Sequence, residues 1–460
     1  MSYQSVNPYN GKVLRTFDGL TDAELESALD SAATRFESWR HTTFAERAVV
    51  VAKAANILRA HLDEFARTVT LEMGKRINES RDEVRLSADI LDYYAKNAEA
   101  FLAPQHLNPS SGTAVVESCP LGIIFGVQPW NFPYYQLARF AAPNIMAGNV
   151  VMVKHAGSVP QCAIAFDKLW REAGAPAGVY SNLRISHEQV NQVIDDSRIR
   201  GVALTGSVEA GKIVAARAGL NLKKSTMELG GSDAFIVLED ADLDKTVKWA
   251  VLSRMNNMGQ CCNAPKRFIV AEALGEQFLA KLQAALAEYK SGNPMDESTT
   301  LAPLSSEAAL LKLLDQVKRA IEHGATLIMG GNRIACEGAF MQATILTNIQ
   351  SDNPAFSEEF FGPVALVFRV GNEDEAIALA NHSEFGLGGA VFTRDVARGT
   401  RVASRIDTGM VFINHPAGSA ADLPFGGIKN SGYGRELSSM GIQEFVNKKL
   451  LRIVSIDAPA

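Results

Sequence analysis

The stretch GVALTGSVEAGK, residues 201–212, joins a short apolar run to a glycine-bearing turn and then to a helical segment. A continuous apolar, β-branched run is typical of a buried parallel strand. A strand that leads directly into a helix is the repeating unit of an α/β domain. Gly206 and Gly211 lie where a helix N-terminus would meet an anion. Their spacing is not G-x-G-x-x-G, so the turn by itself is a weak dinucleotide fingerprint.

The pattern continues on both sides of this stretch. The runs TAVVES (113–118), GIIFGV (122–127) and VVMVK (150–154) are also interpreted as buried parallel strands, and PQCAIAFDKLWREAG (160–174) as a helix between two of them. Upstream, residues 21–39, 43–71 and 76–103 have helical spacing. The first of these segments opens with a capping box, Thr21 and Glu24. Together they predict a doubly wound α/β domain with a helical N-terminal part.

A second alternating series follows residue 230. We expect strands at AFIVL (234–238), RFIVAE (267–272), ALVFRV (365–370), GAVFTR (389–394) and MVFIN (410–414), with helices near 242–256 and 273–290. This series predicts a second α/β domain. The tail FVNKKLLRIVSI (445–456) reads as one further strand, which must pair elsewhere in the chain or on another subunit.

Length and composition limit the class of protein. The 460 residues are too many for one ordinary core, and 47% hydrophobic with 21% charged residues is typical of a folded, soluble protein. The net charge of −6, without a basic run, gives no reason to expect nucleic acid or membrane as a partner. The N-terminus lacks the pattern of a signal peptide, so we expect a cytoplasmic protein.

Five cysteines are present, with no CxxC and no histidine at ligand spacing. An odd number without an export signal argues against a disulfide framework, and we expect no metal site. The adjacent pair in NNMGQCCNAPKR (256–267) is open to three interpretations. It could be a packed pair, a strained vicinal disulfide, or a nucleophile beside a bystander, and these residues alone favour the packed pair.

Two other side chains suit catalysis. Glu228, in TMELGGSDAFIV (226–237), lies in an apolar, glycine-rich stretch, where desolvation would raise the pKa of a carboxyl toward that of a general base. Alternatively it caps a helix or pairs with Lys223 or Lys224. Asn131, in QPWNFPYYQLAR (128–139), is held between two prolines after a strand and could donate to an oxyanion, or simply make an Asx turn.

The order of the motifs resembles that of the aldehyde dehydrogenase superfamily. The seven motifs are WNFP, VK, TGSxxxG, ELGG, GQxC, EExFGP and PFGGxKxSGxGRE, at residues 130–133, 153–154, 205–211, 228–231, 259–262, 358–363 and 424–436. The resemblance covers essentially the whole chain and is closest to the short bacterial succinate-semialdehyde dehydrogenases. An enzyme is therefore expected rather than a non-catalytic binding or structural relative.

The resemblance implies a role for each matching residue. Cys262 would be the nucleophile that forms a thiohemiacetal and then a thioester. Asn131 and the Cys262 N–H would hold the oxyanion, and Glu228 would activate the hydrolytic water. The matching cofactor positions are Trp130, Lys154, Gly206, Ser207, Gly211, Glu359 and Phe361.

The cofactor expected is NADP in preference to NAD. NAD-preferring members often carry a glutamate three residues after the lysine, and here that position is Gly157. Without a carboxylate to repel a 2′-phosphate, Lys154 can pair with it. His155 and Ser158 are close enough in sequence to reach the phosphate as well.

For the substrate, the resemblance implies an aldehyde, above all succinate semialdehyde. Arg139 matches an arginine that binds the distal carboxylate, and Ser419 matches a serine that can assist. The second arginine of some members is Asn256 here. A broad-range enzyme for medium-chain or aromatic aldehydes therefore stays open, as does a surface position for Arg139. Cys261 could act as a redox partner of the nucleophile or pack behind it.

We expect three parts in the fold. Residues 1–105 and 121–230 would form a Rossmann-like NAD(P)-binding domain, and 231–440 an α/β catalytic domain. Residues 106–120 and 441–460 would form a small β-segment for oligomerisation, giving a homodimer or homotetramer.

Overall fold

The first of two large sheets has six strands and is flanked by helices. The computed structural model describes residues 2–457. The strand order is β19-β9-β8-β5-β6-β7, and all neighbours are parallel except β19. The strands are β5 (Ile123–Gln128), β6 (Val150–His155), β7 (Tyr180–Asn182), β8 (Ile199–Thr205), β9 (Lys224–Glu228) and β19 (Gly432–Tyr433). The expected α/β domain is therefore present, and it recruits a strand from the far end of the chain.

The helices around this sheet include those formed by the N-terminal part of the chain. They are α1 (Asp22–Trp39), α2 (Phe44–Ala60), α3 (Leu62–Met73), α4 (Ile77–Phe101), α5 (Pro133–Met146), α6 (Pro160–Ala173), α7 (His187–Asp195) and α8 (Val208–Leu220). The capping box at Thr21 is present, since its hydroxyl accepts from the Glu24 N–H. The expected helix at 43–71 is two helices, because the backbone leaves the helical region at His61.

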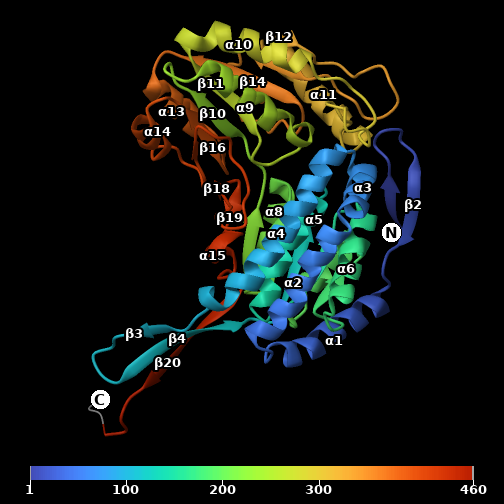
Figure 1. The fold of residues 1–460 in the computed structure, drawn as a ribbon, viewed down its shortest axis with the longest axis vertical. Coiled ribbons are helices and arrows are strands. Elements are labelled where there is room, and N and C mark those ends of the chain that lie inside the picture. The colour runs from blue at the N-terminus through green and yellow to red at the C-terminus, as the bar shows by residue number, and fades with distance from the viewer. Residues whose placement is uncertain (1, 458–460) are drawn as a thin grey trace.

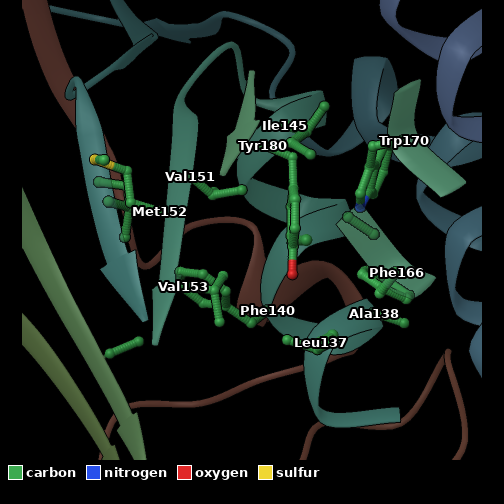
Figure 2. Packing of buried hydrophobic residues seen from close by; sticks show 14 of the residues in the cluster. Leu137, Ala138, Phe140, Ile145, Val151, Met152, Val153, Phe166, Trp170 and Tyr180 are labelled. Atoms are coloured by element: carbon green, nitrogen blue, oxygen red, sulfur yellow. The ribbon is translucent and has the colours of Figure 1, made fainter. Parts of the chain in front are cut away.

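Helix α5 is buried along its whole length. Figure 2 shows side chains of β6 on one side of α5 and side chains of α6 on the other. Gly126 in β5 allows this close packing, because a Cβ there would lie 2.6 Å from the Phe140 ring. Trp170 stacks on Tyr180 with 5.9 Å between ring centroids. Close packing of this kind leaves α5 little room to shift.

The second sheet has seven strands in the order β12-β13-β14-β11-β10-β16-β17, parallel except for the β12–β13 pair. Its strands are β10 (Asp233–Val237), β11 (Pro265–Ala271), β12 (Thr326–Met329), β13 (Thr344–Thr347), β14 (Val364–Val370), β16 (Gly389–Phe392) and β17 (Phe412–Ile413). Its helices are α9 (Leu243–Met255), the 3₁₀ turn η1 (Asn256–Gly259), α10 (Glu272–Ala287), α11 (Glu307–Glu322), α12 (Pro354–Ser357), α13 (Glu373–Asn381) and α14 (Val396–Ala403). The short α15 (Ser438–Gly441) lies instead against α4 of the first half, where the Tyr94 hydroxyl donates to the Ser438 carbonyl. Figure 1 shows this second half above the first, in yellow-green to orange-red.

A three-stranded antiparallel sheet extends away from the body (Figure 1). It consists of β3 (Gln105–Leu107), β4 (Thr113–Pro120) and β20 (Val446–Ile453), with Ile453 opposite Thr113. The tail strand therefore pairs within the chain. The interpretation of 113–118 as a buried parallel strand was wrong, because β4 is antiparallel and mostly only partly buried. Two small sheets complete the fold: β1 (Ser2–Val6) with β2 (Val13–Asp18), and β15 (Phe385–Gly386) with β18 (Ile428–Lys429).

Candidate active site

The cysteine pair lies on an unusual turn between α9 and β11. Three consecutive residues before it, Asn257, Met258 and Gly259, have positive φ angles of 49°, 52° and 73°. Only glycine adopts that region without cost, and a buried methionine there is a strained position that the surroundings must hold. A Cβ at Gly259 would lie 2.2 Å from the Gly362 carbonyl oxygen. Such strain typically persists where a turn must present a functional side chain.

Hydrogen bonds connect this turn to the loop of Asn131. The Asn131 Nδ2 donates to the Gln260 carbonyl at 3.0 Å, and the Asn257 Nδ2 donates to the Asn131 carbonyl at 2.9 Å. The Asn131 amide is therefore positioned beside the turn that carries the cysteines. The sequence predicted these two stretches as site residues separately, and the fold brings them together.

A buried ion pair anchors the same loop from behind. The Lys75 ammonium pairs with the Glu83 carboxylate and lies 3.6 Å from the centroid of the Phe132 ring. Glu83 also accepts the backbone N–H groups of Tyr134 and Tyr135, at the start of α5. A carboxylate at a helix N-terminus is favourable both as a hydrogen-bond acceptor and for the helix dipole.

A cavity of about 350 Å³ opens beside the cysteines. It contains Cys262, Asn131 and Ser419 together, three of the residues predicted from the sequence. Its lining mixes polar and aromatic groups and has acidic residues but no arginine or lysine. The full lining is Glu79, Asp82, Glu83, Leu86, Asn131, Phe132, Tyr135, Gln136, Trp249, Leu252, Ser253, Asn256, Cys261, Cys262, Asn263, Ala264, Pro416, Ala417, Gly418, Ser419 and Phe425.

The two thiols differ in access. Cys262 is partly exposed, whereas Cys261 is buried and its Sγ lies 3.6 Å from the Asn256 carbonyl oxygen. Burial raises the pKa of Cys262 to about 11, and the Arg139 and Lys266 cations oppose that rise. Burial raises the pKa of Cys261 to about 12. Of the three interpretations of the pair, a vicinal disulfide is absent from this structure, in which both cysteines are free.

Glu228 ends strand β9 in the interior. Neither carboxylate oxygen accepts a hydrogen bond from any group within residues 2–457, and the side chain does not line the cavity of Cys262. Burial raises the pKa of this carboxyl well above its usual value, and the neighbouring Glu436 carboxylate raises it further. Lys223 and Lys224 do not pair with it, because Lys223 donates to backbone carbonyls and Lys224 lies near Glu444. Desolvation of this kind favours the protonated form of the carboxyl.

Arg139 is placed differently from the expectation of direct substrate contact. Its guanidinium is buried, forms an ion pair with Glu436 and donates to the Thr205 hydroxyl at 3.1 Å. It does not line the cavity, and it is not a surface residue either. It reaches the cavity only through Tyr135: its Nη1 lies 3.0 Å from the Tyr135 hydroxyl, which lies 2.9 Å from the Ser419 Oγ.

The expected cofactor residues gather at the carboxyl ends of the first sheet and along its border with the second. Trp130 meets Phe361 edge to face, with 5.8 Å between ring centroids. The Glu359 carboxylate accepts the Gly231 N–H at 3.0 Å. A Cβ at Gly230 would lie 2.4 Å from the Glu359 Oε2, so glycine keeps space there for this carboxylate. This border has the polar and aromatic groups that a nicotinamide ribose and ring require.

The adenosine end of the cofactor is expected to bind near β6 and α8. Lys154 is partly buried, and no carboxylate within residues 2–457 pairs with it. Ser207 caps α8 by accepting from the Ala210 N–H at 3.3 Å, and Gly211 packs against Leu229. Gly157 and Ser158 are exposed on the turn after β6. Lys154 lies near the end of β6 and the N-terminus of α8 follows β8 of the same sheet, and a lysine together with a helix N-terminus fits a phosphate-bearing cofactor.

His155 does not fit the role expected of it. The ring is buried, its Nε2 lies 3.1 Å from the Pro133 carbonyl, and its Nδ1 accepts the Ala156 N–H at 3.0 Å. Burial lowers the pKa of this imidazole to about 4, so the ring is neutral at pH 7. Both nitrogens are occupied within the protein, so the geometry argues against a contact with a phosphate.

Sequence reasoning missed several residues of this site, notably Lys75, Glu83, Lys266 and Glu436. One signal for Lys266 was available, because it directly precedes the run 267–272, which is predicted as a buried strand, and a lysine buried there needs internal partners. Glu436 could not have been found in that way, since its partner Arg139 lies almost 300 positions earlier in the chain.

Comparison with known proteins identifies close relatives. Residues 1–451 match the model of the aldehyde dehydrogenase family. A succinate-semialdehyde dehydrogenase [NADP(+)] of Deinococcus radiodurans is 49% identical over 98% of this chain and 94% of its own. The succinate semialdehyde dehydrogenase [NAD(P)+] Sad of Escherichia coli is 43% identical over 96% of both chains.

A solved structure shows the same fold. The succinic semialdehyde dehydrogenase of Streptococcus pyogenes, in complex with NADP+, superposes with a TM-score of 0.97. It is 47% identical and matches 98% of this chain and all of that one. Within residues 2–457, no helix is both long enough and apolar enough to cross a bilayer.

Proposed function

This chain belongs to the aldehyde dehydrogenase family, and on that premise we propose that it oxidises succinate semialdehyde to succinate, with NADP preferred and NAD accepted. The observation that carries the proposal is the position of Cys262 and Asn131 at one cavity whose wall includes the hydroxyls of Tyr135 and Ser419. Relatives named for this substrate and cofactor support it.

The nucleophile needs a proton acceptor. With a pKa of about 11 the Cys262 thiol is protonated at pH 7, so attack on the aldehyde carbon must be coupled to loss of that proton. Cys262 lines the cavity and is partly exposed, so the proton would pass to water there. The oxygen that becomes negative would be held by the Asn131 amide and the Cys262 N–H.

The cofactor would be held by Trp130, Glu359 and Phe361 at the nicotinamide end and by Lys154 and Ser207 at the adenosine end. The chemistry that a bound nicotinamide supplies is acceptance of the hydride from the carbon bonded to Cys262. The protein is then left as a thioester. Glu228 would remove a proton from water, the water oxygen would bond to the acyl carbon, and the carbon–sulfur bond would break to free the acid and the thiol.

The distal carboxylate of the substrate would meet hydroxyls rather than a bare cation. Ser419 and Tyr135 face the cavity, and Arg139 donates to the Tyr135 hydroxyl from behind. A charged donor polarises the hydroxyls in line with it, which makes them better donors to an anion. Arg139 would then act through Tyr135.

A second candidate is a broad-range aldehyde dehydrogenase. The absence of arginine and lysine from the cavity lining, together with acidic Glu79 and Asp82, favours uncharged aldehydes. The two candidates are separated by kcat/KM for succinate semialdehyde and for butanal, each with NADP and with NAD. A preference of a hundredfold or more for the semialdehyde supports carboxylate recognition, whereas equal values would leave only the broad-range activity.

The three-stranded sheet would assemble subunits, giving a homodimer or homotetramer. It carries the exposed apolar side chains Leu107, Leu450, Ile453 and Val454, and a β-sheet edge with such side chains is suited to association. Light scattering on the full chain distinguishes the states. A monomer at micromolar concentration would refute this part of the proposal.

A further inference from the structure

We propose that Lys266 is a positioning residue that strengthens the oxyanion hole through the peptide bond between the two cysteines. The proposal rests on the function proposed above, because it assigns a task in the attack by Cys262.

Lys266 is buried in β11, directly behind the nucleophile. Its ammonium donates to the Cys261 carbonyl at 2.7 Å and to the Cys262 carbonyl at 2.5 Å. It also lies 3.3 Å from the Glu359 carboxylate, and its side chain has no exposed surface. A buried ammonium is costly unless several acceptors surround it, and here two carbonyls and a carboxylate do.

One of these carbonyls, that of Cys261, belongs to the peptide group whose N–H would hold the oxyanion. The oxygen of Cys261 and the N–H of Cys262 are the two ends of a single conjugated amide. A cation on the oxygen draws electron density from the nitrogen and makes its N–H a stronger donor. The N–H so strengthened is the one that would hold the oxyanion, beside the Asn131 amide.

The same ammonium connects the nucleophile to the cofactor side. Glu359 accepts the Gly231 N–H at 3.0 Å and shares the charge of Lys266. Gly231 approaches the nucleophile closely, since a Cβ there would lie 2.6 Å from the Cys262 carbonyl oxygen. Lys266 thus holds the Cys262 backbone and Glu359 in one network, so that their relative position is set before the substrate binds.

If Lys266 had a purely structural role, it would only balance the charge of buried carboxylates nearby. Burial raises the pKa of the nearby Asp233 to about 6, and Lys266 opposes that rise. Loss of the lysine would then destabilise the protein and impair every reaction of Cys262 to a similar degree. The oxyanion role differs, because it affects only reactions that pass through a tetrahedral oxyanion.

Two reagents separate these roles without cofactor. 4-Nitrophenyl acetate acylates a thiol through a tetrahedral oxyanion, with 4-nitrophenolate leaving. Iodoacetamide alkylates it by direct displacement of iodide, with no oxyanion. The quantity measured is the ratio of the two second-order rate constants at Cys262, for wild type and variants, after thermal unfolding shows that each is folded.

Lys266→Gln keeps a hydrogen-bond donor and removes the charge. We expect the acylation-to-alkylation ratio to fall about tenfold, less than the roughly hundredfold or greater effect of deleting an oxyanion donor outright. Asn131→Ala should lower the same ratio further. Lys281→Met is the matched control, because Lys281 forms an exposed ion pair with Asp244 and should leave the ratio unchanged.

A wild-type ratio in Lys266→Gln would overturn the proposal and leave Lys266 a countercharge. If that variant does not fold, Lys266→Arg replaces it. The wider guanidinium does not place one nitrogen between both carbonyls, so the ratio should still fall at least threefold, and an unchanged ratio would again overturn the proposal. If wild type reacts with both reagents but oxidises no aldehyde, the proposed function fails while this test still stands.

Discussion

The guanidinium of Arg139 and the carboxylate of Glu436 form an ion pair in the interior, between helix α5 and the glycine-rich segment near the C-terminus. Each compensates the buried charge of the other, and Glu228 lies close enough to be influenced by both. This pair keeps Arg139 out of the substrate cavity and makes it part of the support for that cavity.

Removal of one partner should therefore destabilise the protein. Arg139→Ala leaves Glu436 buried and unpaired beside Glu228, and we expect a loss of about 3–5 kcal/mol in the free energy of unfolding. Glu436→Gln, which removes the opposite charge, should restore part of that loss in the double variant. Urea unfolding of the four proteins gives the coupling energy. Additive losses would contradict the pairing.

The contact of Arg139 with Tyr135 also predicts that the Tyr135 and Ser419 hydroxyls contribute to binding of the substrate carboxylate. Tyr135→Phe and Ser419→Ala should each lower kcat/KM for succinate semialdehyde by about 10- to 150-fold, one hydrogen bond to a charged group being worth roughly 1.5–3 kcal/mol. The value for butanal should change little. A parallel fall for both aldehydes would show that these hydroxyls do not bind a carboxylate.

Glu228 should be needed for release of the acid more than for its formation. In Glu228→Gln we expect a burst of NADPH close to one per active site, followed by turnover at least a hundredfold slower, because the thioester forms but the water lacks its base. Rapid-mixing absorbance measurements resolve the burst. Its absence would mean that Glu228 is required already for deprotonation of Cys262.

The preference for NADP should depend on the absence of a side chain at Gly157. A Cβ there would meet only the Tyr3 ring, at 3.6 Å, so Gly157→Glu should be accommodated. Its carboxylate would repel a 2′-phosphate and pair with Lys154, and kcat/KM with NADP should fall by roughly 10–100-fold. Gly157→Gln, of similar size and no charge, is the control. An equal loss in both would indicate steric obstruction instead.

His155 should make the protein sensitive to acid. Its folded pKa of about 4 lies below the usual 6.5, so the folded state binds fewer protons than the unfolded state between these values. The stability that depends on the neutral ring is complete above pH 6.5 and is lost as the pH falls toward 4. At pH 5 the loss should be about 2 kcal/mol. Urea unfolding at pH 7 and 5 should show this loss in wild type and not in His155→Gln.

The sequence by itself determined the family and the two α/β series, because these depend on local pattern and on the order of motifs, and the resemblance made Cys262 the candidate nucleophile. Short apolar runs bounded by glycine and proline predict strands wherever the chain folds, and the seven motifs identify Cys262, Asn131 and Glu228 by their order. The tail strand was also recognisable from local residues alone, although its partner was not, whereas helix α5 was not predicted.

Only the tertiary structure decided what each polar side chain does. Arg139 and His155 were expected to contact ligands, but packing gave each an internal partner: Glu436 for one and backbone carbonyls for the other. Lys266 became a structural part of the nucleophile turn in the same way. Burial requires a polar group to be satisfied by whatever the fold places beside it, and that neighbour is remote in sequence.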